Sequence, residues 1–364
     1  MRNINVLGMV FPSQHDSDLP GLTGQRCFGS VPFGGRYRLI DFVLSNMVNA
    51  GISKVGLVTK SHSQSLMDHV GSGKSWDLNR KNGGLFILPT NLSDTAYEGL
   101  VAALHDVCSF LTHSIEEYVL MADCRMLGNI DYAALVERHI ASGADVTVAY
   151  KTGLAPSDSM LLAFDGDRVA EIRFGGREEA SFGLGLYVIR RETLLQLTEE
   201  AYGHSRDSFE RDILQRRLGE LTVMGYEVPE YLAPIYSLAT YFEANMALLD
   251  PAVRAQIFLP RRRIYTKVRD CAPAIYGLHS DVTDSLVADG AVIKGTVRHS
   301  VIFRDVMVDP GVVVEDCVLM QGSEIRADAK LGYVICDKNV QVRDAASLQG
   351  VAHYPVYVKK GMKI

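Results

Sequence analysis

The sequence lacks the features that mark several large classes of protein. Its 364 residues hold a single tryptophan, Trp76, and six cysteines with no Cys-x-x-Cys pair among them. The histidines show no zinc-ligand spacing either, so the pattern signals neither a structural metal site nor a disulfide framework. Isolated thiols in a chain of this length are typical of a reducing compartment, and we expect a cytoplasmic protein.

Long apolar runs and a surplus of positive charge are also missing. No apolar run approaches the roughly 20 residues that span a bilayer, and the first residues lack the apolar core of a signal peptide. Lysine and arginine number 37 against 43 aspartates and glutamates, a net charge of −6. This balance argues against a nucleic-acid partner, and we expect no membrane partner. The length favours two domains.

The first two-thirds of the chain alternates strand-like and helix-like segments. Such alternation predicts a mixed, mostly parallel sheet with helices on both faces, whose chemistry lies beyond the carboxyl ends of the strands. The expected strands are residues 4–10, 55–59, 118–122 and 145–150, and the expected helices are residues 39–48, 97–111 and 131–142.

After about residue 250 the pattern changes. Apolar residues recur at steps of six, as in Val306, Val312 and Val318, and glycines punctuate the same stretch. This period is typical of a parallel β-helix, whose coils bury their inner faces by stacking; the alternative is a sandwich of short strands. We therefore expect an α/β domain over residues 1–250, a proline- and arginine-rich linker over 251–280, and a left-handed β-helix of hexapeptide repeats over 281–364.

One segment is highly specific. Residues 31–42 read VPFGGRYRLIDF and follow Arg26. This string resembles the hallmark of glucose-1-phosphate adenylyltransferases, and further matches at residues 44–46, 208–214 and 284–287 extend the likeness over the whole chain in order. The resemblance implies a Rossmann-like nucleotidyltransferase domain before the β-helix. Active members use Mg²⁺ to make ADP-glucose and pyrophosphate from ATP and glucose-1-phosphate.

The nucleotide-binding elements of that family are altered here. The family's Gly-Gly-x-Gly-x-Arg-Leu loop is replaced by residues 8–18, GMVFPSQHDSD, so only Gly8 remains, and Gly99 opens a second altered stretch, GLVAA. A loop with Phe11 and Pro12 cannot let backbone amides approach a phosphate as successive glycines do. A phosphate-binding lysine corresponds to Phe28, and the lysine that grips glucose-1-phosphate has no counterpart near residues 172–176.

The family's metal site is altered as well. Catalysis needs two carboxylates that hold Mg²⁺; Asp123 matches the first, and Pro234 stands at the second. One carboxylate is a weak magnesium site, so we interpret Asp123 as vestigial and Gly8 and Gly99 as remnants of the nucleotide loop. The chain thus resembles the regulatory subunit of bacterial ADP-glucose pyrophosphorylase. It is expected to need no cofactor itself, Mg²⁺ serving a catalytic partner subunit in a heterotetramer, and self-association is also possible.

Arginines supply the remaining functional signal. Arg26 and Arg38 match family positions that bind phosphorylated effectors between the two domains, and Arg36 lies beside them. The forked guanidinium suits bidentate phosphate contacts. The linker triplet, residues 261–263, could approach the same cleft; the alternative for all of these is a solvated surface charge.

Two other functions stay open. A working adenylyltransferase could recruit Asp212 as its second carboxylate, and a hexapeptide acyltransferase could use His299 as a base. His62 and His69 are expected on a helix surface. Trp76 is expected to anchor its glycine-rich loop to its own domain.

Overall fold

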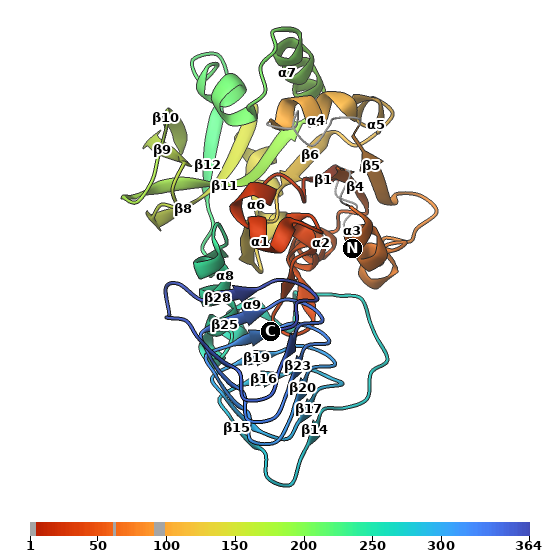
Figure 1. Cartoon of the computed structure of the whole chain (residues 1–364). Coiled ribbons are helices and arrows are strands. Elements are labelled where there is room, and N and C mark those ends of the chain that lie inside the picture. The colour runs from red at the N-terminus through yellow and green to blue at the C-terminus, as the bar shows by residue number, and fades with distance from the viewer. Residues whose placement is uncertain (1–4, 61–62, 91–98) are drawn as a thin grey trace.

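The computed structural model describes residues 5–60, 63–90 and 99–364, arranged as an α/β domain above a β-helix (Figure 1). Ile4, His62 and Tyr97, which fall in predicted elements, lie outside the described residues. The family expectation of a Rossmann-like domain followed by a left-handed β-helix is confirmed.

A nine-stranded sheet in the order β5-β4-β1-β6-β11-β8-β12-β10-β9 forms the centre of the α/β domain. Strands β5, β4, β1 and β6 are parallel neighbours, whereas β11 runs antiparallel to both β6 and β8, so the sheet is mixed as predicted. Its strands are β1 (Val6–Val10), β4 (Lys54–Thr59), β5 (Gly84–Pro89), β6 (Tyr118–Ala122), β8 (Val146–Leu154), β9 (Ser159–Asp165), β10 (Arg168–Gly175), β11 (Glu179–Arg190) and β12 (Val223–Glu227).

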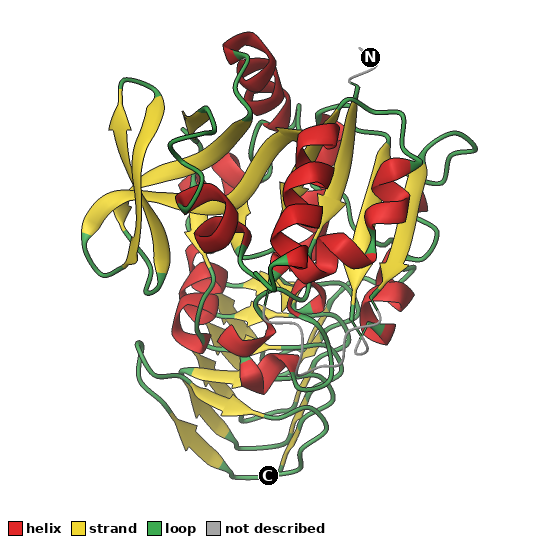
Figure 2. Cartoon of the chain, turned by 90° about the horizontal axis from the view of Figure 1, so that it is seen from above, coloured by secondary structure: helices red, strands yellow, loops and turns green. Residues whose placement is uncertain are grey.

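Helices cover both faces of this sheet (Figure 2). Val6 and Val10 of β1 belong to the hydrophobic cluster that includes α2 and α6, and Leu7 and Met9 belong to the cluster that includes α4 and α7. Alternate side chains of one strand thus serve two cores, which explains the continuous apolar run in the sequence. The helices are α1 (Pro20–Thr23), α2 (Leu39–Asn49), α3 (Gln64–Val70), α4 (Leu100–Asp106), α5 (Cys108–Thr112), α6 (Tyr132–Ser142), α7 (Arg191–Gly203), α8 (Leu238–Ala247) and α9 (Pro251–Ile257), with 3₁₀ turns η1 (Asp16–Asp18), η2 (Phe28–Ser30) and η3 (Lys74–Trp76) and a π-helix, η4 (Phe209–Gln215).

The predicted elements recur with small shifts in their bounds. The predicted helix over residues 39–48 is α2, and Gly51 follows its last turn with φ of 85°. The predicted helix over 97–111 is two helices in its described part, α4 and α5, joined at Val107. Two short ribbons complete the domain, one of β2 (Pro32–Phe33) and β3 (Tyr37–Arg38) and one of β7 (Met126–Gly128) and β13 (Leu232–Pro234).

The β-helix consists of three five-stranded parallel sheets. Val297 pairs with Val314, which pairs with Leu331, and all three side chains are buried inside the coils. The six-residue period predicted from the sequence is therefore confirmed. Each hexapeptide forms one of the three faces of a coil. The strands are β14 (Ile275–Tyr276), β15 (Asp281–Thr283), β16 (Leu286–Val287), β17 (Val292–Ile293), β18 (Thr296–Arg298), β19 (Val301–Ile302), β20 (Met307–Val308), β21 (Val313–Glu315), β22 (Val318–Leu319), β23 (Glu324–Ile325), β24 (Lys330–Gly332), β25 (Val334–Cys336), β26 (Gln341–Val342), β27 (Ser347–Gln349) and β28 (Val356–Val358).

The segment predicted as a linker has more structure than expected. Helix α9 occupies residues 251–257, and the first strand of the β-helix begins at Ile275 rather than after residue 280. Between them the chain runs to the far end of the β-helix, so that β14 and β15 lie farthest from the α/β domain and β25 and β28 lie close to it (Figure 1). The late coils therefore meet the α/β domain.

Corners of the β-helix stack a glycine on a polar residue of the next coil. Gly311 has φ of 78°, and a Cβ built there would lie 2.0 Å from Oδ1 of Asp328, which itself has φ of 60°. Gly290 over Asp305 and Gly322 over Asn339 repeat the arrangement. Glycine is required at these corners for two reasons, the left-handed backbone and the lack of space for a side chain.

Gly311→Ala is expected to destabilise the protein by about 2–4 kcal/mol, because left-handed strain adds to the clash with Asp328. Gly361→Ala is the matched control: its φ is 71° with no atom within 4 Å of the added Cβ, and only about 1 kcal/mol is expected. Urea denaturation followed by circular dichroism measures both. Equal losses for the two variants would show that the corner contact contributes nothing.

None of the helices in the described part of the chain has the length and apolar character that a membrane span requires.

Candidate functional site

Two cavities contain three of the residues that the sequence singled out, namely Asp123 in one and Arg36 and Arg38 in the other. The first, here called the nucleotide-site pocket, lies beyond the carboxyl ends of β1 and β6 and has a volume of about 490 Å³. This is where a doubly covered sheet of this kind places its ligands. Its polar lining includes Gln14, His15, Asp18, Asp123, Arg125 and Glu210.

Asp123 is engaged by its own protein. Its Oδ2 lies 2.9 Å from Nε2 of His15, and its Oδ1 accepts the backbone N–H of Arg125 at 2.9 Å. Asp18 lies beside this pair, with Oδ2 3.2 Å from Nε of Arg125. Both oxygens of the carboxylate that matches the family's first metal ligand are therefore hydrogen-bonded within the protein.

The residues present do not fit a magnesium ion. Pro234 pairs with Met126 in the β7–β13 ribbon and offers no side-chain ligand. The described residues contain no group of three or more His, Cys, Asp or Glu side chains placed to hold a metal. The hypothesis that Asp212 replaces the missing carboxylate is wrong in this geometry. Its Oδ2 accepts the backbone N–H groups of Asp207 and Ser208, and Asp212 does not line the pocket.

Gly8 and Gly99, which the family resemblance implies to be remnants of the nucleotide loop, are tightly packed positions. Gly8 lies inside β1, where a Cβ would come within 2.7 Å of Sδ of Met47 in α2. Gly99 caps α4, and a Cβ there would lie 1.9 Å from the carbonyl oxygen of Asp207, which also accepts the N–H of Val101. Neither glycine lines the nucleotide-site pocket.

Phe28 shows how the loop has been rebuilt. Its ring is buried where the family has a phosphate-binding lysine, and its backbone N–H donates to Oδ1 of Asp16 at 2.6 Å. Pro12 accepts the N–H of Gly29 at 2.8 Å. The loop therefore uses its amides within itself, and the nearby carboxylates would repel a triphosphate that arrives without a metal.

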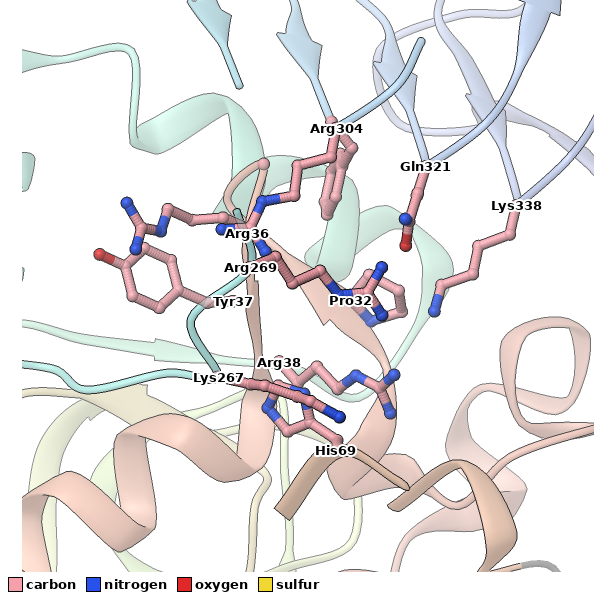
Figure 3. Close-up of a pocket in the computed structure, with 12 residues that line it drawn as sticks. Pro32, Arg36, Tyr37, Arg38, His69, Lys267, Arg269, Arg304, Gln321 and Lys338 are labelled. Atoms are coloured by element: carbon pink, nitrogen blue, oxygen red, sulfur yellow. The ribbon is translucent and has the colours of Figure 1, made fainter. Parts of the chain in front are cut away.

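The second cavity, here called the basic pocket, lies between the two domains (Figure 3). Its volume is about 40 Å³, and of the described residues that line it none is acidic. The β2–β3 hairpin, the linker and the β-helix each contribute cations to it. These are Arg36 and Arg38, then Lys267 and Arg269, then Arg304 and Lys338.

The cations of this pocket are crowded and partly desolvated. Burial lowers the pKa of Arg38 to about 10, despite the nearby Asp41, so its guanidinium stays charged. Burial also lowers the pKa of Lys338 to about 7, and the positive charges of Arg38 and Arg26 lower it further. Because several positive charges share a small space, an anion there would stabilise all of them.

Arg26, for which the family resemblance implies an effector contact, does not line the basic pocket. Its side chain is 3% exposed, and Nη2 donates to both carboxylate oxygens of Asp337, at 2.8 and 3.0 Å. Arg38 does line the pocket and anchors itself by donating from Nη1 to the carbonyl oxygen of Ser65 at 2.6 Å. Arg36 lines it too and is exposed.

The arginine triplet of the linker, residues 261–263, does not line this pocket. Arg262 pairs with Asp131 and Glu230, and Arg261 lines a different cavity beside Trp76. Sequence reasoning missed Lys267, Arg269, Arg304 and Lys338. The only available signal was spacing, because Arg304, Gln321 and Lys338 follow one another at a fixed interval of one coil.

His69 is buried, contrary to the prediction of a surface histidine. It is 7% exposed, its Nε2 lies 2.6 Å from Oδ1 of Asp41, and its ring meets Trp76 edge-on at 5.8 Å. Burial lowers its pKa, which keeps it neutral near pH 7 despite Asp41. Trp76 is 1% exposed, which confirms that it anchors its loop.

His299 lies at a corner of the β-helix. Its Nδ1 contacts Oδ1 of Asp316 at 2.6 Å and its Nε2 lies 3.8 Å from Asp284, so it links neighbouring coils. This role explains the histidine without acyl transfer.

Comparison with known proteins agrees with this architecture. Residues 18–171 match the nucleotidyl transferase family model, and residues 274–352 match the GlmU-like C-terminal hexapeptide model. The chain is 35% identical to the glycogen biosynthesis protein GlgD of Bacillus subtilis (strain 168), over all of this chain and 98% of the relative. It is 30% identical to the glucose-1-phosphate adenylyltransferase of Bacillus cytotoxicus (strain DSM 22905 / CIP 110041 / 391-98 / NVH 391-98), over 93% of each chain.

The chain belongs to the glucose-1-phosphate adenylyltransferase family. A second glycogen biosynthesis protein GlgD, from Geobacillus stearothermophilus, is 38% identical over 86% of this chain and 83% of the relative. The resemblance carried by residues 31–42 is therefore confirmed. In this adenylyltransferase-family chain, His15 contacts Asp123 and Pro234 offers no side-chain ligand to the same pocket, whereas six basic side chains line the pocket between the domains.

Proposed function

We propose that this chain is a regulatory member of the family, acting in glycogen synthesis beside a catalytic glucose-1-phosphate adenylyltransferase subunit in the cytoplasm. The observation that carries the proposal is the contrast between the two pockets. Asp123 has His15 on one oxygen, and Pro234 stands where the family has its second metal-binding carboxylate, while six cations line the basic pocket. The chain itself would need no cofactor, and Mg²⁺ would serve the partner.

The basic pocket would take a small phosphate-bearing metabolite. Its cations come from the hairpin, the linker and the β-helix, so one bound anion would tie these three segments together. An effector that prefers one arrangement of the domains shifts the population toward it, and a subunit interface can pass that coupling free energy to the partner. The feature that such a metabolite requires is its phosphate group.

Sulfate binding is expected to weaken about tenfold between pH 6 and pH 8. Lys338, whose pKa is lowered to about 7, is mostly protonated at pH 6 and mostly neutral at pH 8, and only the ammonium attracts the anion. Sulfate keeps its charge over this range, so the change reports the protein. Isothermal titration calorimetry measures it.

Lys338→Arg is the control for this pH dependence. The arginine should keep the affinity and remove most of the change, since its guanidinium stays protonated. An unaltered pH profile in that variant would assign the titration to another group.

A mixing experiment tests the regulatory role. The purified chain is combined with a catalytic relative, and ADP-glucose formation is measured with and without phosphorylated metabolites. Co-purification of the two chains and a rate or effector response above the sum of the separate proteins are expected. Strictly additive rates and no co-purification would overturn the proposal. Arg304→Ala, which removes one pocket cation, should reduce the effector response and leave co-purification intact.

A further inference from the structure

Asp337 joins the two domains at one buried point. It is 1% exposed and receives the side chain of Arg26 from the α/β domain. Within the β-helix, its Oδ1 accepts the backbone N–H of Lys338 at 2.7 Å, and its Oδ2 lies 2.9 Å from the hydroxyl of Tyr357. The carboxylate thus orders the backbone of the coil that carries Lys338 into the basic pocket.

Tyr357 extends this network back into the α/β domain. Its hydroxyl lies 2.7 Å from the carbonyl oxygen of Gly21, at the beginning of α1. A Cβ on Gly21 would lie 2.9 Å from the tyrosine ring, so the close approach depends on glycine. The hydroxyl has a single proton and two acceptors, Gly21 and Asp337. A change in the charge felt by Asp337 therefore alters the bond to α1.

The segment from His15 to Phe28 carries this contact to the other pocket. Thr23 donates through Oγ1 to the carbonyl oxygens of Asp16 and Leu19, at 2.7 and 2.8 Å. Asp16 in turn accepts the N–H of Phe28. The middle of this internally bonded segment holds Gly21 against Tyr357, and its first residue, His15, contacts Asp123.

The charge of Arg26 connects the network to the basic pocket. Arg26 lies near enough to lower the pKa of both Arg38 and Lys338, and its Nη1 is buried with no hydrogen-bond partner. An anion beside these cations would compete with Asp337 for their positive charge. The network is therefore poised to respond to occupancy of the pocket.

We propose that Asp337 and Tyr357 are positioning residues that couple an anion in the basic pocket to the His15–Phe28 segment over Asp123. This inference rests on the proposed anion-binding function. Under this proposal the nucleotide-site pocket responds to the basic pocket. Binding of an anion in the basic pocket orders the His15–Phe28 segment that covers Asp123.

Hydrogen exchange of the full chain, measured by mass spectrometry with and without saturating sulfate, tests this coupling. In the wild type, sulfate should slow exchange in peptides that cover residues 267–269 and 338. It should also slow exchange at least about fivefold in peptides that cover residues 15–24, the lower end of ordinary allosteric coupling. Tyr357→Phe should keep the first effect and lose the second. Tyr354→Phe is the control, because Tyr354 is 82% exposed.

The outcomes separate the coupling from the anion site itself. A wild-type response confined to the pocket peptides, or a Tyr357→Phe variant that still protects residues 15–24, would overturn the coupling. No response to sulfate in either set of peptides would instead contradict the anion pocket, and the coupling with it. Should Tyr357→Phe fail to fold, Thr23→Val replaces it, since Thr23 lies outside the pocket and its loss breaks the same segment internally.

Discussion

Asp337→Ala is expected to lower the free energy of unfolding by about 3–5 kcal/mol, because removal of one partner leaves a buried charge unpaired. The partner is Arg26, which is 3% exposed. The variant also removes an acceptor from Tyr357 and from the backbone N–H of Lys338. Urea denaturation of the full chain measures the loss.

Asp281→Ala provides the matched control. Asp281 also pairs with an arginine of the β-helix, Arg298, at 2.9 Å, but the two side chains are 49% and 51% exposed. Removal of an exposed pair is expected to cost less than about 1 kcal/mol. The double change Arg26→Met with Asp337→Leu should cost less than the sum of the single changes, since neither charge is left alone. Equal losses for Asp337→Ala and Asp281→Ala would show that the buried pair has no special weight.

The purified chain alone is expected to form ADP-glucose at least about 10³-fold more slowly than a catalytic relative. A lost metal site and a lost phosphate-binding loop each remove electrostatic stabilisation of the transition state, and one such group is commonly worth about 10²–10³ in rate. Both are altered here, at Asp123 with Pro234 and at residues 8–18. Chromatographic detection of ADP-glucose under matched substrate and Mg²⁺ concentrations gives the comparison.

Restoring one carboxylate should not rescue this rate. In Pro234→Asp, His15 still occupies Oδ2 of Asp123, and the amide of Phe28 still bonds to Asp16. Turnover by the wild-type chain within about tenfold of the catalytic relative would contradict the expected slow rate. Such a rate would show that the site stabilises the transition state despite the contacts of His15 and Phe28.

Most of the fold was predictable because it depends on local periodicity. The unbroken apolar run before Phe11 and the six-residue steps around Val312 each specify how one side chain relates to its neighbours. The end of the linker was not predictable from the sequence. Ile275 and Tyr276 form the first strand of their sheet in the described part of the chain and pair with β17, and because both side chains are exposed, they show no pattern of buried apolar residues. The split between α4 and α5 has no glycine or proline to announce it.

The candidate site was predictable in its chemistry and not in its contacts. Asp123 follows a buried strand, so its place at the sheet edge followed from the sequence. His15, its partner, lies 108 residues away and carries no local signal. Arg26 also has a distant partner. Its guanidinium suggested that it binds an anion, but nothing in the sequence indicated that this anion is the carboxylate of Asp337 in the last coils of the β-helix. For His69, the helix spacing was correct, yet the packing of α3 against Trp76 and Asp41 buried a position that looks solvent-facing in isolation.

The bond from Arg26 to Asp337 spans 311 positions of the chain. During synthesis, Arg26 is therefore made long before Asp337, which neutralises its charge. The interval between Gly21 and its partner Tyr357 is longer still. Until the last coils of the β-helix are made, the basic pocket lacks Lys338, and Arg26 lacks its carboxylate partner. Under the proposed function, the response to a phosphorylated metabolite would therefore be the last property that the chain acquires.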